Sequence, residues 1–143
     1  MEQATMTDVH ETLRQMRDHA EVTVLAQGGW LTADQMSGLA RELCAEELKS
    51  WNAEGRIFTI ERDGEIFYPS FALDPQNHYH PYPVLAALIK LYSGAGRSRW
   101  DLAFWLTSVN GYLRGLAPRA LINGEEEVLL SAARHGLAPI EHG

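Results

Sequence analysis

Apolar positions recur every three or four residues over two long stretches of the chain, residues 7–26 and 83–92. This period matches one face of an α-helix, so both stretches are predicted to be helical. The second stretch is apolar nearly all round and is expected to be largely buried. Both helices have plausible starts, at the N-cap residue Thr7 and at Pro83.

Local start signals predict further, shorter helices. The patterns that begin at Thr32 and Ser98 have the form of a capping box, in which the first and fourth residues bond each other's backbone. Asn123 is expected to cap a last helix, whose first turn carries three glutamates. Besides the helices already named, three shorter ones are expected over residues 32–40, 44–54 and 98–107.

Between the helices the apolar period shortens to two. Residues 56–69 are rich in β-branched and aromatic side chains, and Asp63-Gly64 in their middle suits a tight turn, so a β-hairpin is expected. The proline-, asparagine- and histidine-rich loop at 74–83 is the best candidate boundary. The fold is therefore expected to be mainly α with one β-hairpin, divided into a head over 1–74 and a small helical domain over 83–143.

Composition narrows the class of protein. The chain has 143 residues, of which 45% are hydrophobic and 22% charged, as in ordinary globular proteins. No apolar run is long enough to span a bilayer, and the acidic, polar N-terminal residues lack the pattern of a secretory signal. The only cysteine, Cys44, cannot form an internal disulfide and is expected to be a small buried residue. We expect a cytoplasmic protein without membrane contact.

The charge is unevenly distributed along the chain. Residues 1–74 carry six basic and fourteen acidic groups, whereas residues 75–143 carry six basic and five acidic groups. Because phosphate attraction supplies much of the affinity for DNA, the acidic first half is a poor match for a nucleic acid.

No set of residues has the spacing of a catalytic or metal site. His78 and His80 lie two residues apart in a loop without an evident carboxylate or thiolate to complete a metal shell. The carboxylates at Asp101 and in residues 125–127 are better explained as favourable charges at helix starts. We therefore expect no enzymatic activity, no metal and no cofactor.

Residues 99–122 combine rigid aromatic side chains with arginines, a mixture typical of partner-binding surfaces. The arginines of this region outnumber its acidic groups, which suits either an acidic partner or a solvated face. Side chains expected to lie mostly in the core are Leu102, Phe104, Trp105 and Leu106.

The head resembles the winged helix-turn-helix of excisionase- and MerR-like proteins. The resemblance rests on Trp30-Leu-Thr-Ala-Asp-Gln, and on Leu48 to Phe58 with its Gly-Arg-Ile element before the hairpin. It implies a DNA-binding transcription regulator, but the glutamates on the second helix oppose phosphate contact. The candidate DNA-binding residues are Lys49, Asn52, Arg56 and Arg62.

Residues 83–135 resemble the toxin-binding domain of Xre/MbcA/ParS antitoxins. The chain matches that family's pattern at Trp105, Leu106, Asn110, Leu113, Gly115, Pro118, Leu121 and Ile122. It differs from the pattern at Gly111, Arg114, Arg119 and Ala120.

The resemblance implies an antitoxin that forms a homodimer and occludes a RES-type toxin, an enzyme class that consumes NAD or transfers ADP-ribose. The candidate toxin-binding residues are Trp105, Asn110, Leu113, Arg114, Gly115, Pro118 and Arg119. Two alternatives remain, a DNA-binding regulator that uses the winged head and an interaction module whose partner is not a toxin.

Overall fold

The structure is a computed structural model, and it describes the backbone of residues 5–138 and the side chains of residues 8–138. The described chain is mainly helical, with a small antiparallel sheet, as the sequence predicted. The helices are α1 (Thr5–Ala26), α2 (Ala33–Ser37), α3 (Ala45–Ala53), α4 (Pro83–Gly94), α5 (Arg99–Thr107) and α6 (Glu126–Leu137). Four 3-10 turns join them: η2 (Ser70–Ala72), η3 (Pro75–Asn77), η4 (Gly111–Leu113) and η5 (Pro118–Leu121).

The predicted hairpin forms, in a shorter version than expected. Strands β2 (Ile60–Arg62) and β3 (Glu65–Pro69) pair antiparallel with Ile60 opposite Phe67. Asp63 and Gly64 both have positive φ, 54° and 80°, which confirms the tight primed turn. Residues 56–59 form no strand, and Ile57 and Phe58 among them are buried in the core.

Two further pairings were not predicted. Strand β1 (Trp30–Leu31) pairs with β3, and β4 (Leu73–Asp74) pairs with β5 (His80–Pro81). Each of these strands has two residues, which is too short to show an alternating pattern. The second pair shortens the 74–83 loop into a compact turn, and the backbone N–H of Tyr82 donates to the carbonyl of Ala72 at 2.9 Å.

The capping boxes at Thr32 and Ser98 are confirmed by reciprocal side chain–backbone hydrogen bonds. The cap predicted at Asn123 is wrong, because the 3-10 turn continues past this residue. The backbone N–H groups of Gly124 and Glu125 both donate to the carbonyl of Leu121, so α6 starts later, at Glu126. Cys44 is the N-cap of α3 and is exposed, not buried.

One hydrophobic core extends through both halves of the chain. It includes Trp51 and Phe58 from the first half and Leu88, Leu102 and Leu129 from the second. Helix α4 packs on α5 and α6, and α5 also contacts α1 and β2. The head over 1–74 and the region over 83–143 therefore share buried surface.

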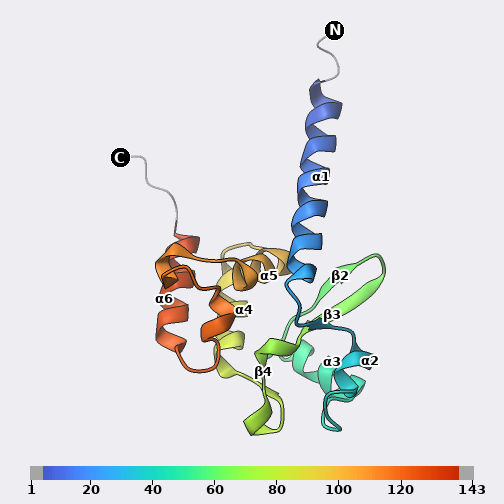
Figure 1. The fold of residues 1–143 in the computed structure, drawn as a ribbon, viewed down its shortest axis with the longest axis vertical. Helices are drawn as coiled ribbons and strands as arrows, with labels where there is room; N and C mark the ends of the chain where they lie inside the picture. Colours follow the sequence, from blue (N-terminus) through green and yellow to red (C-terminus); the bar gives the residue numbers. More distant parts are fainter. Residues whose placement is uncertain (1–4, 139–143) are drawn as a thin grey trace.

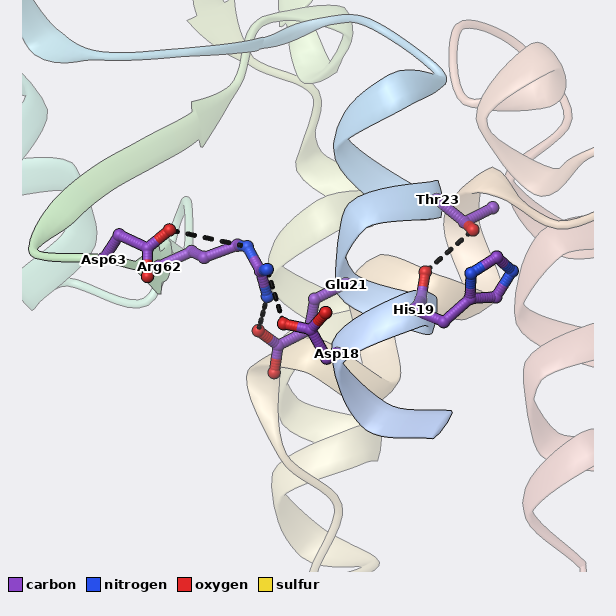
Figure 2. Close-up of polar contacts among 6 residues, drawn as sticks. All are labelled: Asp18, His19, Glu21, Thr23, Arg62 and Asp63. Carbon is purple, nitrogen blue, oxygen red and sulfur yellow. Dashed lines mark hydrogen bonds and ion pairs between the residues drawn. The ribbon is translucent and has the colours of Figure 1, made fainter. Parts of the chain in front are cut away.

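Helix α1 extends well beyond the other elements (Figure 1). Its C-terminal half is held to the hairpin by Arg62, whose guanidinium donates to Asp18 at 2.5 Å and to Glu21 at 3.0 Å (Figure 2). These hydrogen bonds, with Asp18 first, raise the pKa of Arg62 above its ordinary value. In residues 5–138, no helix is long and apolar enough to cross a membrane.

Candidate partner-binding surface

Helix α5 and the loop that follows it position the candidate site. The Ser98 capping box starts the helix: Ser98 Oγ accepts from the backbone N–H of Asp101 at 3.1 Å, and the Asp101 carboxylate accepts from the N–H of Ser98 at 2.9 Å. Leu102 and Leu106 lie one turn apart and are fully buried. Because this face of α5 is buried, the opposite face of the helix is turned toward solvent.

The loop after α5 is closed by its own hydrogen bonds. The backbone N–H of Asn110 donates to the carbonyl of Leu116 at 3.0 Å, and the N–H of Gly115 donates back to the carbonyl of Asn110 at 2.9 Å. The Asn110 side chain accepts from the N–H of Tyr112 at 2.8 Å. Gly115 has a φ of +82°, a conformation that glycine adopts without strain. The loop is therefore a closed turn with a defined backbone.

Four large apolar side chains are exposed on this segment, and we call them the 104–116 patch: Phe104, Val109, Tyr112 and Leu116. Val109 is the most exposed, at 78%. Tyr112 is held in place because its hydroxyl lies 3.0 Å from Ser131 Oγ and its ring stacks on His135 of α6. Phe104 was expected in the core and is instead about half exposed. Sequence periodicity could not assign it because α5 is apolar on most of its faces.

The predicted toxin-binding residues divide into exposed and structural ones. Arg114 and Gly115 are exposed at the tip of the loop. Arg114 has a φ of +59°, and its side chain has no hydrogen bond or ion pair with any described residue. Leu113 and Pro118 are buried, and Trp105 is partly buried against Tyr92, with 6.0 Å between ring centroids.

Arg119 occupies a structural position. Its guanidinium donates to the backbone carbonyls of Gly28 at 2.8 Å and Gln27 at 3.0 Å, just past the C-terminus of α1. It also lies over the ring of Phe71, 5.5 Å from the centroid. A cation bonded to the last carbonyls of a helix stabilises that helix end. Arg119 therefore ties α1 to the second half of the chain.

A cavity of about 520 Å³ lies beside the patch, between α1, α5 and α6. Phe104, Val109 and Trp105 contribute to its wall from α5 and the following loop, and Ala20 and Val24 contribute from α1. The Trp105 indole N–H in this wall is buried and has no hydrogen-bond partner among residues 8–138. The volume falls in the range of ligand and side-chain pockets.

Two of the four candidate DNA-binding residues of the head already contact groups within the chain. Arg62 is held by Asp18 and Glu21. Arg56 lies 3.1 Å from His80 Nδ1 and 3.7 Å from Glu54, and its guanidinium is 5.5 Å from the centroid of the Trp51 ring. Lys49 and Asn52 are exposed on α3.

The part of the chain that the structure describes contains few groups suited to metal binding or catalysis. No group of three or more His, Cys, Asp or Glu side chains could hold a metal ion there. His78 lies 3.9 Å from Glu42, and both are exposed. Burial raises the pKa of the Tyr92 phenol to about 12, so this hydroxyl stays neutral further into the alkaline range than an exposed tyrosine does.

Comparisons of the chain with family models, with curated proteins and with solved structures gave no match.

Proposed function

We propose that this chain is an antitoxin-like, non-enzymatic protein that binds a toxin enzyme and occludes it through the 104–116 patch. The main support is the patch itself, in which Val109, Tyr112 and Leu116 are exposed on a loop closed by hydrogen bonds and Phe104 is exposed on the helix before it. Clusters of exposed apolar side chains mark interaction sites on soluble proteins. A loop that is already ordered loses little conformational freedom when its partner binds.

The class of partner follows from the chemistry around the patch. Arg114 stands at the tip of the same loop with its guanidinium free of described partners, which suits a carboxylate or phosphate on the other molecule. The resemblance of this segment to antitoxin toxin-binding domains favours a RES-type enzyme as that molecule. The proposed toxin therefore presents an apolar pocket with an acidic or phosphate-bearing edge.

Charged substitutions in the patch test the proposal. We expect Val109→Asp and Leu116→Asp each to weaken binding of a RES-type toxin by more than about tenfold, because each buries an unpaired carboxylate in the interface. The measurements are calorimetric titration with the toxin and rescue of cells that express it. Ile66→Asp is the matched control, since Ile66 is as exposed as Leu116 and lies on the hairpin, away from the patch.

Arg114→Met should weaken the complex by a smaller factor while leaving the fold intact, since this side chain has no hydrogen bond or ion pair with any described residue. The assignment would be refuted if Val109→Asp, Leu116→Asp and Arg114→Met all bound the toxin and rescued cells as well as the wild type does. The patch would then lie outside the interface.

For the head, we propose a winged helix-turn-helix-like scaffold that does not read DNA. Helices α2 and α3 pack together and the hairpin follows them, in the order of that motif. Two of its four candidate DNA-binding residues, Arg56 and Arg62, already contact groups within the chain. We expect no salt-dependent retention of a promoter fragment from the chain's own operon. Retention that weakens steeply with salt would contradict this, because phosphate contacts release counterions.

A further inference from the structure

The cavity between α1, α5 and α6 has a wall rich in aromatic side chains. From α5 the wall receives Trp100, Phe104 and Trp105, and the C-terminal part of α1 packs against the same helix (Figure 1). The volume of about 520 Å³ is within the range of small-molecule sites. Aromatic side chains pack closely against flat apolar molecules. The cavity can therefore hold the body of a small aromatic ligand.

One polar group in the cavity wall has no partner. Tyr92 is 4% exposed and lines the cavity, and its hydroxyl makes no hydrogen bond with any residue in 8–138. Unlike the indole N–H of Trp105, this hydroxyl is not closed off from solvent. Burial raises its pKa to about 12, so it keeps its proton and can donate a hydrogen bond. A buried donor that no protein group satisfies calls for an acceptor from outside the chain.

The charged groups of the wall differ in their partners. Glu21 accepts from the guanidinium of Arg62 at 3.0 Å (Figure 2), and Asp101 accepts from a backbone N–H of its capping box at 2.9 Å. Arg17 and Arg97 also line the cavity, but neither side chain has a hydrogen bond or ion pair with any described residue. The charges of the wall that lack a partner are therefore both positive.

We propose that this cavity binds a small aromatic anion, such as an aromatic carboxylate. The body of the ligand packs between the aromatic side chains of α5 and the C-terminal part of α1, and its anionic group is held by Arg17, Arg97 and the Tyr92 hydroxyl. Guanidinium groups bind carboxylates through charge-assisted hydrogen bonds. The wall shares Phe104 and Val109 with the 104–116 patch, but the proposal does not depend on a toxin, because it is tested on the chain alone.

Fluorescence titration of the full chain with anilinonaphthalene sulfonate tests the proposal, because this probe joins an aromatic body to an anionic group. We expect saturable binding at one site per chain. Tryptophan emission should fall at the same time, since Trp100 and Trp105 lie in the wall and transfer energy to the probe. Phenylnaphthylamine, which has nearly the same aromatic body without the sulfonate, measures the contribution of the apolar wall alone.

The role of the cations is tested by the double variant Arg17→Gln, Arg97→Gln. It should weaken binding of the sulfonate probe by more than about tenfold and leave binding of the uncharged probe unchanged, because only the charge-assisted hydrogen bonds are lost. Arg134→Gln is the matched control, since Arg134 is an exposed arginine outside the cavity wall. Tyr92→Phe should weaken binding of the sulfonate probe by about fivefold, the effect of one hydrogen bond.

The place of binding is tested by filling the cavity. Ala20→Phe adds a ring to the α1 side of the wall and should abolish binding of both probes. Leu116→Asn should leave both unaffected, because Leu116 belongs to the 104–116 patch but not to the cavity wall. Circular dichroism shows whether each variant keeps its helices.

The chemical class of the ligand is tested by competition. Naphthoate, an aromatic carboxylate, should displace the sulfonate probe, whereas inorganic phosphate at matched ionic strength should not. Equal displacement by phosphate would show a site for simple anions and overturn the proposal. It would also be overturned by a lack of saturable binding, by unchanged binding in Arg17→Gln, Arg97→Gln, or by a loss in Leu116→Asn that Ala20→Phe does not show.

Discussion

At the scale of the residue, two arginines five positions apart differ in role because of what surrounds them. Arg114 is exposed on a closed loop and has no hydrogen bond or ion pair with any described residue, whereas Arg119 bonds two backbone carbonyls at the end of α1. The sequence assigned both to partner binding, because the carbonyls are more than ninety positions away from Arg119. Contacts at such separation leave no local pattern in the sequence.

Because of Tyr92, the stability of the fold is expected to fall at alkaline pH. Burial raises the pKa of its phenol from about 10 to about 12 in the folded chain. The folded state therefore holds the proton more tightly than the unfolded state does. The stabilising contribution is complete below about pH 10 and is lost as the pH rises through about 12.

We expect the free energy of unfolding, measured by urea titration, to fall by about 1–2 kcal/mol more in the wild type than in Tyr92→Phe between pH 9.5 and about 12. Burial also raises the pKa of Tyr68 and Tyr82, so some decline should persist in the variant. Tyr112→Phe, an exposed ring, is the control. Parallel pH profiles for wild type and Tyr92→Phe would contradict this role.

At the scale of the element, the capping boxes were predicted better than single cap residues and packing. The predicted N-cap Thr7 was wrong, since α1 begins before it, at Thr5. The Thr32 and Ser98 capping boxes were correct because a capping box is complete within four residues. The cap predicted at Asn123 was wrong because a 3-10 turn precedes this residue and the turn continues past it. No local sequence pattern indicates that turn. The exposure of Phe104 depends on where α6 and α1 lie, which α5 itself does not encode.

The end of α1 is stabilised by Arg119 from outside the helix. We expect Arg119→Met to lower the free energy of unfolding by about 1–2 kcal/mol, since two charge-assisted hydrogen bonds to the helix end are lost while the apolar stem is kept. The measurement is urea denaturation together with amide hydrogen exchange in α1. Arg114→Met is the control and should leave both unchanged; equal stability of the two variants would refute the capping role.

At the scale of the whole molecule, the sequence predicted the helical class and the hairpin, while the way its halves join came only from the structure. The composition change at 74–83 suggested a boundary, yet α5 packs on both α1 and β2 across it. The candidate site was predicted as a segment, since aromatic residues and arginines cluster in 99–122. Its exposed members could not be separated from its buried ones, because that depends on long-range packing.

The contact between Arg119 and α1 also affects which sequence changes the fold can accept. Arg119 bonds the main-chain carbonyls of Gln27 and Gly28, so the side chain at position 27 takes no part. Position 28 needs a residue that tolerates a φ of +84°, which favours glycine. Substitutions at 27 can therefore accumulate freely while 119 is held to arginine. The connection between the two halves is therefore constrained at both of its ends, by the arginine at 119 and the glycine at 28, and leaves position 27 free.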